Sequence, residues 1–298
     1  MNHETFPDKK EWSISFEEAT RQVQDMTDFR ERMEVGQENA TWLPHGEYPQ
    51  LPIMFVWMTD IHWGHVGTDH QRLLNHLKIV EDTPNTFVLF GGDLIDNFSA
   101  VKHPHAATGD VFPPQVQAEA MMAKITELDR QSKVGALCYG NHEDWMQYAG
   151  MDFYQTFMRE LSAPVFHKGG MLNVNLEGQN YRIGVTRKHW GTSKITPENS
   201  GHRALLYTYP GADIVLLGDD HQAAGSVFSQ GGERKIVVDG GTYKLNDSFG
   251  QKVGLGKAGA PGYTIMLSPG GKRMELYDNP ETAQRDMLNM IFRVEHGE

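Results

Sequence analysis

Four short runs of apolar residues recur along the chain, each bounded by polar or glycine-rich sequence. The runs are Ile53–Met58, Phe87–Phe90, Val134–Tyr139 and Ile214–Leu217. They lack the alternation of apolar and polar positions that a strand with one solvated face shows. Runs of this length are typical of β-strands that are buried on both faces. We therefore expect these segments to form the buried strands of the fold.

Longer stretches with helical spacing lie between and after these runs, at about Gln115–Gln131, Met151–Leu161, Pro197–Tyr207 and Glu281–Val294. Short alternating or hairpin-like segments fill much of the second half: Pro164–His167, Met171–Leu176, Tyr181–Val185, Gly225–Phe228, Lys235–Val238, Tyr263–Leu267 and Arg273–Tyr277. Alternating strands and helices followed by hairpins predict an α/β protein, with mixed sheets flanked by helices.

Residues 1–50 differ from the rest because they are polar and mixed in charge. A helix is expected from Phe16 to Arg32, and prolines interrupt the chain between that helix and the first apolar run. We predict an N-terminal extension over residues 1–50 and a single catalytic domain over residues 51–298.

The composition excludes several classes of protein. With 39 acidic and 27 basic residues in 298, the formal net charge is −12, which argues against wrapping nucleic acid by bulk charge. Every apolar run is far shorter than the ~20 residues of a membrane-spanning helix, so we expect no membrane partner. Cys138 is the single cysteine, which excludes an internal disulfide and favours a cytoplasmic protein.

Residues that can bind metals follow each of the four apolar runs. The segments are Thr59-Asp60-Ile61-His62, Gly91-Gly92-Asp93, Gly140-Asn141-His142-Glu143 and Gly218-Asp219-Asp220-His221. Hydrophobic packing explains the apolar runs, but it does not explain Asp, Asn or His after every one of them. Because ligands gather at the carboxyl ends of strands in α/β sheets, we expect these segments to converge on one site.

In order and spacing, these segments resemble the calcineurin-like metallophosphoesterase superfamily. Its pattern is Asp-x-His, Gly-Asp, Gly-Asn-His-(Glu/Asp), an isolated His and finally Gly-His-x-His. The resemblance covers residues 53–245. It implies a four-layer α/β sandwich, in which helices flank two mixed β-sheets. It also implies a hydrolase that cleaves phosphate esters at a dinuclear metal centre.

The resemblance also implies a set of ligands. They are Asp60, His62 and His221 for one metal, Asp93 as the bridge, and Asn141, His189 and Asp219 for the second metal. His189 follows the expected strand Tyr181–Val185, where the family places its isolated histidine, and His202 is a rival for this role. We prefer His189, because a strand end is a fixed platform and His202 is expected on a helix. Mn²⁺ is the expected metal, with Mg²⁺, Fe, Zn²⁺ and Ni²⁺ as alternatives.

The chain departs from the family pattern at its last motif, where Asp219 stands in place of a histidine. A carboxylate can still bind a metal, and it favours harder ions such as Mn²⁺ or Mg²⁺. We expect Asp219 to be a ligand. The alternative is a weakened or empty second site, in which Asp219 only accepts hydrogen bonds.

His142 and Asp93 are the expected catalytic residues. Two metals about 4 Å apart would clamp the oxygens of an in-line displacement, and a bridging hydroxide would attack phosphorus. His142 would face the substrate and stabilise the transition state or protonate the leaving oxygen. The alternative for His142 is a structural role at its strand end. Candidates for supporting or substrate-binding roles are Glu143, Asp144, Arg187 and His65.

The Trp-Gly element after His189 and the lack of an obvious large cap resemble the DNA-repair-nuclease branch of the superfamily. We therefore expect a phosphodiesterase with nuclease-like activity on a nucleotide or nucleic acid. The acidic charge favours a nucleotide or a single strand over a long duplex. One alternative is a phosphomonoesterase that acts on a protein or a small molecule. Another is a catalytically impaired scaffold of the same fold, which Asp219 would permit.

Overall fold

The computed structural model describes residues 15–21, 24, 38–97, 109–146, 152–191, 193, 195–245 and 261–297. The chain divides into two compact units, Met1–Gln37 and Glu38–Glu298. In the first unit, residues 16–21 are helical, and the Ser15 hydroxyl accepts a hydrogen bond from the Glu18 N–H (3.1 Å). Most of the remaining predicted helix, up to Arg32, lies outside the described residues.

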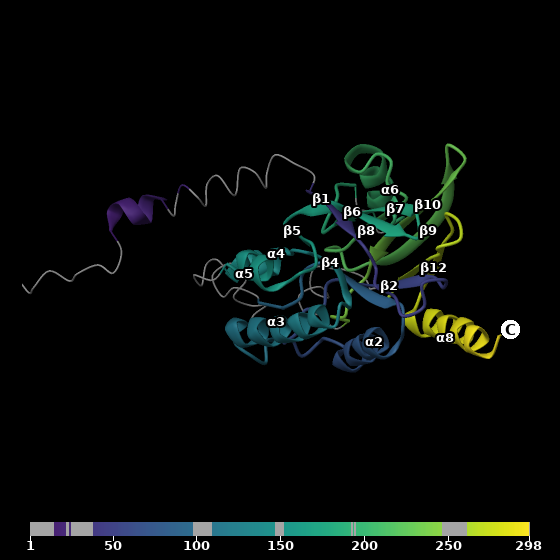
Figure 1. Cartoon of the computed structure of the whole chain (residues 1–298). Helices are drawn as coiled ribbons and strands as arrows, with labels where there is room; N and C mark the ends of the chain where they lie inside the picture. The colour runs from purple at the N-terminus through teal and green to yellow at the C-terminus, as the bar shows by residue number, and fades with distance from the viewer. Residues whose placement is uncertain are drawn as a thin grey trace, which may run out of the picture. The chain divides into compact units, whose positions relative to one another are not determined.

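Two mixed six-stranded sheets form the centre of the second unit (Figure 1). The first contains, in spatial order, β1 (Glu38–Trp42), β6 (Gly169–Leu176), β7 (Gln179–Thr186), β8 (Ile214–Leu217), β10 (Glu233–Gly240) and β9 (Ala223–Gln230). The second contains β12 (Met274–Tyr277), β11 (Thr264–Leu267), β2 (Ile53–Met58), β3 (Thr86–Phe90), β4 (Val134–Cys138) and β5 (Val165–Phe166). Strands β2 to β5 pair in parallel, as do β7, β8 and β10, whereas the hairpins pair antiparallel.

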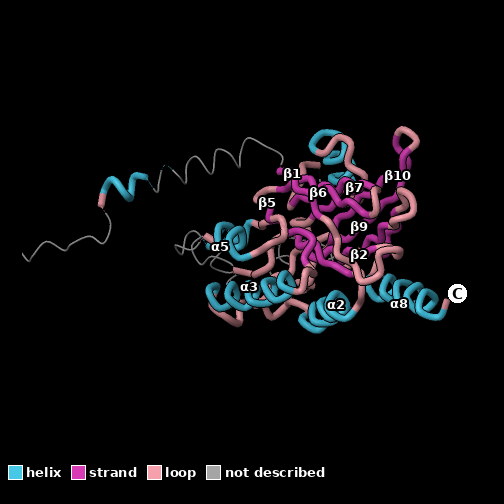
Figure 2. The backbone as a smooth tube through the Cα atoms, viewed as in Figure 1, coloured by secondary structure: helices cyan, strands magenta, loops and turns pink. Residues whose placement is uncertain are grey.

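Helices cover the outer faces of the sheets, while the strands occupy the middle (Figure 2). The second sheet contacts, among others, α2 (His70–Asp82), α3 (Pro114–Arg130) and α8 (Pro280–His296). Helix α6 (Asn199–Arg203) and the π-helical turn η3 (Ala204–Thr208) contact the first sheet. Two further helices are α4 (Asn141–Asp144) and α5 (Phe153–Glu160). The helix–sheet–sheet–helix order confirms the predicted α/β sandwich.

The main hydrophobic core lies between the two sheets and draws side chains from both. Trp57 of β2 is fully buried there, and its Nε1 donates a hydrogen bond to the carbonyl oxygen of Leu217 at the end of β8 (3.1 Å). This bond joins the carboxyl end of a strand in one sheet to the carboxyl end of a strand in the other. The same contact brings together the polar segments that follow β2 and β8.

The four apolar runs form β2, β3, β4 and β8, and every residue in these strands is buried. The stretch Pro197–Tyr207 forms α6 and η3 rather than one regular helix. Strand β1 was not predicted, because it is short and polar, yet it pairs in parallel with β6. Strand β1 lies within residues 1–50, the segment expected to be an extension. The boundary of that extension stays a prediction.

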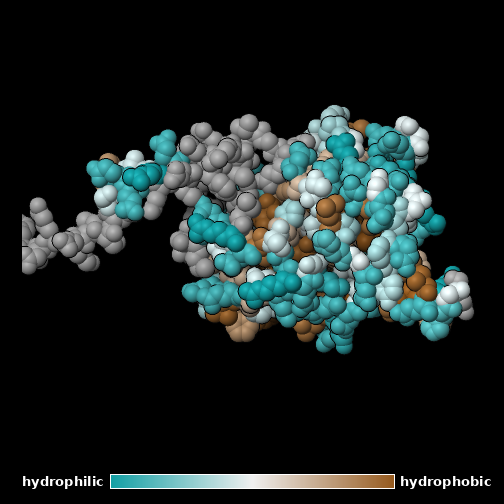
Figure 3. All heavy atoms as spheres, viewed as in Figure 1, coloured by the Kyte–Doolittle hydropathy of each residue, from teal (hydrophilic) through white to brown (hydrophobic). Residues whose placement is uncertain are grey.

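The face of the molecule seen in Figure 3 is mostly hydrophilic, and its hydrophobic residues lie in separate small patches. This distribution fits a fold whose large apolar side chains are used between the sheets and beneath the helices. Among the described residues, the helices are too short or too polar to cross a membrane.

Candidate metal centre

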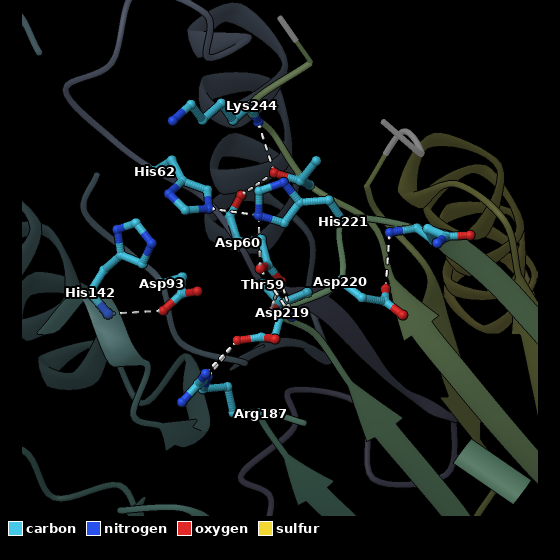
Figure 4. A network of polar contacts seen from close by, with 12 residues as sticks. Thr59, Asp60, His62, Asp93, His142, Arg187, Asp219, Asp220, His221 and Lys244 are labelled. Atoms are coloured by element: carbon cyan, nitrogen blue, oxygen red, sulfur yellow. Dashed lines mark hydrogen bonds and ion pairs between the residues drawn. The ribbon is translucent and has the colours of Figure 1, made fainter. Parts of the chain in front are cut away.

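The polar segments that follow β2, β3, β4 and β8 meet at one place in the fold (Figure 4). Asp60 and His62 follow β2, Asp93 follows β3, His142 follows β4, and His221 follows β8. Parallel strands end on the same edge of a sheet, so their following residues are brought together. The predicted convergence of these segments is therefore present in the structure.

Five residues of these segments have a left-handed backbone conformation. They are Asp60 (φ 50°), His62 (φ 49°), Asp93 (φ 50°), Asp219 (φ 75°) and His221 (φ 60°). Residues with a Cβ atom rarely adopt this conformation, which costs about 1–3 kcal/mol at each position. Strain of this kind persists where the surrounding structure imposes it, and here it turns the side chains toward a common point.

Two glycines let the segments approach so closely. A Cβ atom on Gly140 would lie 2.1 Å from the backbone nitrogen of Asp93, and one on Gly218 would lie 2.1 Å from Thr59 Oγ1. Both distances are far below van der Waals contact. Any larger residue at either position would push two of the polar segments apart.

Asp60, His62 and His221 present one donor atom each to a common point, and these atoms all lie within 4.8 Å of one another. The Nε2 atoms of His62 and His221 are 3.0 Å apart, and His221 Nε2 is 3.4 Å from Asp60 Oδ1. Burial lowers the pKa of His221 to about 4 and lowers that of His62 well below its usual value. Both rings are therefore neutral at neutral pH, as metal-binding imidazoles must be.

Asp60 is fully buried near a second buried carboxylate, Asp93. Burial and the charge of Asp93 raise the pKa of Asp60 well above its usual value. Its hydrogen-bond donors are the Thr59 hydroxyl (2.6 Å) and the backbone N–H of Asp219 (3.0 Å), neither of which carries charge. A divalent cation between Asp60 and the two histidines would supply the missing positive charge. The donor set and its charge fit such an ion.

His62 is oriented from behind by a buried ion pair that the sequence analysis missed. Its Nδ1 lies 3.1 Å from Asp96 Oδ1, which also accepts a hydrogen bond from Lys244 Nζ (2.8 Å). Asp96 and Lys244 are 0% and 1% exposed. Burial alone would raise the pKa of Asp96, but His62 and Lys244 outweigh it and lower this pKa. Asp96 therefore lies against the Nδ1 side of the ring, while Nε2 lies toward His221 and the metal position.

Asp96 also belongs to a second cluster of possible ligands, with His62 and His142. Its carboxylate is already neutralised by Lys244, so this cluster offers less negative charge to an ion than the cluster around Asp60. We therefore assign the metal position to Asp60, His62 and His221, and a supporting role to Asp96.

His142 lies beside the metal position, with its ring centroid 4.6 Å from that of His62. Its backbone N–H donates to Asp93 Oδ1 (3.2 Å), and its Nδ1 contacts the carbonyl oxygen of Asp96. A carbonyl oxygen only accepts hydrogen bonds, so the contact places a proton on Nδ1. His142 is thus fixed at both its backbone and its ring.

Glu143 and Asp144 were candidates for supporting roles, and their side chains have contacts other than His142. The fully buried Glu143 carboxylate accepts four backbone N–H bonds, from Asp93, Leu94, Ile95 and Gly140 (2.6–3.2 Å). Burial and the charge of Asp93 raise the pKa of Glu143. Asp144 is partly exposed and lies 3.7 Å from His167 Nε2. Glu143 therefore holds the loop that carries Asp93, and Asp144 lies toward the surface.

Asp219 is paired with two basic residues. Its Oδ1 accepts hydrogen bonds from Arg187 Nε (2.8 Å) and Nη2 (2.5 Å), and its Oδ2 accepts one from Lys188 Nζ. Burial alone would raise the pKa of Asp219, but the charges of Arg187 and Lys188 outweigh it and lower this pKa. Asp219 is therefore a carboxylate engaged with cations of the protein itself.

His189 is buried, and its ring nitrogens contact Thr208 Oγ1 (2.9 Å, Nε2) and the carbonyl oxygen of Trp190 (3.1 Å, Nδ1). It does not join either cluster of possible ligands among the described residues. Asn141 differs, because its Oδ1 is buried and has no hydrogen-bond partner in the described part of the chain. An unpaired buried amide oxygen fits a metal ligand, so Asn141 stays a candidate, whereas His189 is engaged elsewhere.

The remaining predicted residues support the fold around the site. His65 Nδ1 accepts a hydrogen bond from the Gly67 N–H (2.9 Å) within its own turn. His202 lies on α6, as expected, and packs against Phe228 with ring centroids 4.5 Å apart. These contacts explain both histidines without placing them at the metal position.

Two further residues were missed at the sequence level. Thr242 Oγ1 donates to the backbone oxygen of Asp60 (2.8 Å) and so holds the strained turn after β2. Burial and the charge of Asp220 raise the pKa of Asp239 to about 10, which keeps Asp239 neutral at neutral pH. Nothing in the local sequence marks Asp239 as buried.

A family model described as calcineurin-like phosphoesterase matches residues 53–223. The chain belongs to the calcineurin-like phosphoesterase family. This match includes all four metal-capable segments, from Asp60 to His221. It confirms the resemblance inferred from these segments, and with it a family of phosphate-ester hydrolases. No curated protein sequence matches the chain.

Among solved structures, the chain is similar to Vps29 from Entamoeba histolytica (a single mutant), at 14% identity and a TM-score of 0.40 over 76% of this chain and 98% of that one. It is also similar to the protein TT1561 of Thermus thermophilus, at 10% identity and a TM-score of 0.43 over 77% of this chain and 99% of that one. A third is the nuclease MPE of Pseudomonas putida, at 14% identity and a TM-score of 0.33 over 75% and 87%. These likenesses are too weak to carry an argument about function.

The role of Asp96 can be tested through metal affinity. We expect Asp96→Asn to weaken Mn²⁺ binding about 10- to 100-fold, because the amide holds the His62 ring less firmly. Isothermal titration calorimetry would measure the change. Asp69→Asn, which alters the N-cap of α2, is the control and should leave Mn²⁺ affinity unchanged. Equal Mn²⁺ affinity in Asp96→Asn and the wild type would contradict the orienting role.

The contrast between neighbouring acids gives a second test. Glu143→Gln should lower the free energy of unfolding by roughly 1–3 kcal/mol, because the amide nitrogen would face N–H donors that need an acceptor. Asp144→Asn, one residue away and partly exposed, should change it by less than about 0.5 kcal/mol. Urea unfolding would measure both, and equal effects would show that Glu143 does not hold the Asp93 loop.

Proposed function

We propose that this protein is a metal-dependent phosphodiesterase that acts on a nucleotide or a short single-stranded nucleic acid. The observation that carries the proposal is the convergence of Asp60, His62 and His221 donor atoms within 4.8 Å of one another. In a chain of the calcineurin-like phosphoesterase family, this cluster fits the metal position of a phosphate-ester hydrolase.

Asp60, His62 and His221 would hold the ion, with Asn141 Oδ1 as a further candidate ligand. A set of imidazole and oxygen ligands suits Mn²⁺, which we propose as the metal, and also Fe, Zn²⁺ or Ni²⁺. When bound, a divalent ion polarises a phosphate oxygen and lowers the pKa of water to near neutral. The protein contributes the fixed positions of these ligands, which the buried Asp96–Lys244 pair supports from behind.

His142 is the residue that we assign to the leaving oxygen. Its Nδ1 is anchored on the Asp96 carbonyl oxygen, and we assign proton donation or a hydrogen bond to substrate to the other ring nitrogen, Nε2. Asp93 fixes the backbone of His142 and adds negative charge beside the metal position. Both residues are buried, so the packing around them restricts their movement.

An exposed aromatic pair supports a substrate that carries a base. Trp190 and Tyr207 are 59% and 68% exposed, and their rings stack with centroids 5.9 Å apart. Arg203 Cζ lies 4.4 Å from the centre of the Trp190 ring. Such surfaces bind unpaired bases by stacking, with a cation nearby to attract phosphate. Trp190 lies three residues after Arg187, whose side chain binds Asp219 next to the metal position. The aromatic pair is therefore linked to the site by a short loop.

The reaction can be tested with two nitrophenyl esters in the presence of Mn²⁺. We expect the full-length protein to hydrolyse bis-para-nitrophenyl phosphate faster than para-nitrophenyl phosphate. His142→Asn should lower kcat about 10²- to 10⁴-fold, because proton donation to the leaving oxygen is lost. His296→Asn, at the exposed end of α8, is the control and should retain full activity.

The outcomes separate the candidate functions. Faster turnover of the monoester would favour a phosphomonoesterase. Bound Mn²⁺ without hydrolysis of either ester would favour a scaffold that keeps the fold to bind partners. If the His142 and His296 variants lost activity to the same extent, the result would contradict a specific role of His142 at the leaving oxygen.

The aromatic pair can be tested with two single strands of equal length, one of which lacks its bases. Trp190→Ala should raise KM for the normal strand about 5- to 150-fold, because a stacked base contributes roughly 1–3 kcal/mol. It should leave KM for the abasic strand unchanged. Steady-state hydrolysis measures both values, and an equal rise for both strands would show that Trp190 does not stack on a base.

A further inference from the structure

The position expected to bind a second metal is occupied by positive charge from the protein. Arg187 and Lys188 together contact both carboxylate oxygens of Asp219, the residue that replaces the family's histidine. A divalent ion placed on the same carboxylate would be repelled by two cations at close range. The geometry of Asp219 therefore does not fit a second metal.

Both the backbone and the side chain of Arg187 are held by hydrogen bonds at the site. It directly follows β7, and its backbone oxygen accepts a hydrogen bond from the Gly218 N–H (3.0 Å), so its backbone is fixed to the end of β8. Its side chain is 28% exposed. Burial alone would lower the pKa of Arg187, but the charges of Asp93 and Asp219 outweigh it and raise this pKa. Arg187 thus adds a permanent positive charge to the carboxylate cluster (Figure 4).

The other ligand expected at the second position is also engaged elsewhere. His189 Nε2 is 2.9 Å from Thr208 Oγ1, and Thr208 ends the π-helical turn η3. Moving His189 to a metal would break this buried hydrogen bond. Three consecutive residues of the loop after β7 thus fill the second position, since Arg187 and Lys188 bind Asp219 and His189 binds η3.

We infer that the centre binds one divalent ion, at Asp60, His62 and His221, and that Arg187 supplies the second positive charge and contacts a phosphate oxygen of the substrate. The inference rests on the proposed phosphoesterase function and specifies how its site is charged. Asp219 holds the Arg187 side chain in place, and Lys188 completes the neutralisation of Asp219 from the more exposed side.

The guanidinium group suits this task. It has five N–H donors, and its hydrogen bonds to Asp219 use Nε and Nη2, which leaves the Nη1 donors for a phosphate oxygen. Arginine binds phosphate through charge-assisted hydrogen bonds in a fixed plane. It stays charged throughout the physiological pH range and cannot be removed by a chelator.

The ion count is the first test. The metal-free full-length protein would be titrated with Mn²⁺ by calorimetry, and the bound metal would be counted by mass spectrometry after desalting. We expect one ion per wild-type chain and none in Asp60→Asn. Two ions per wild-type chain would overturn the inference.

The phosphate contact is the second test, with inorganic phosphate as the probe and the Mn²⁺-loaded protein as the receptor. Arg187→Gln should keep one ion and weaken phosphate binding about 10- to 150-fold, the loss expected for a hydrogen bond to a charged group. Arg182→Gln changes an arginine on β7, the strand that Arg187 follows, away from Asp219, and should leave both values unchanged. Unchanged phosphate affinity in Arg187→Gln, or loss of its ion, would overturn the inference.

These measurements do not depend on turnover. One bound ion and an Arg187-dependent phosphate affinity, without hydrolysis of any ester, would reject the proposed function but uphold this charge arrangement. Hydrolysis by a chain that binds two ions would uphold the proposed function and reject the arrangement.

Discussion

The site depends on the burial of negative charges close to one another. Asp60, Asp93 and Asp219 lie at the ends of strands from two sheets, where the low dielectric makes their repulsion strong. Such a cluster is stable only when cations balance it. The structure supplies a fixed cation at Asp219, through Arg187, and leaves Asp60 with two neutral histidines and uncharged donors. Asp219 is thus neutralised by a cation of the protein, whereas Asp60 is not. This difference in charge balance makes the position at Asp60 the one that fits a metal ion.

The backbone bears much of the cost of this arrangement. Left-handed conformations at residues such as Asp60 and Asp93 are unfavourable, and they are held by hydrogen bonds from outside the turns. Glu143 binds four backbone N–H groups around the Asp93 loop, and Thr242 binds the Asp60 backbone. The packing of the two sheets, including the Trp57 bond to Leu217, maintains these contacts. The fold therefore stabilises a local geometry that the short segments would not adopt alone.

Sequence patterns predicted the buried strands well, because a strand covered on both faces must be apolar throughout. They failed for β1, an edge strand whose polar residues carry no such signal. They also found the segments that meet at the site, since each directly follows a buried strand. Lys244 and Asp96 escaped notice because their pairing joins residues 148 positions apart. A lysine is ordinarily exposed, and only its distant partner explains its burial.

The sequence by itself determined the family, the order of the strands along the chain, and the residue types available at the ends of the four buried strands. Those properties follow from local composition and spacing. Only the tertiary structure decided which side chains face one another. It placed Asp60 with His62 and His221, but it paired Asp219 with Arg187 and His189 with Thr208. The physical reason is that charge balance and hydrogen bonding in a buried site depend on all neighbours at once, including those far away in sequence.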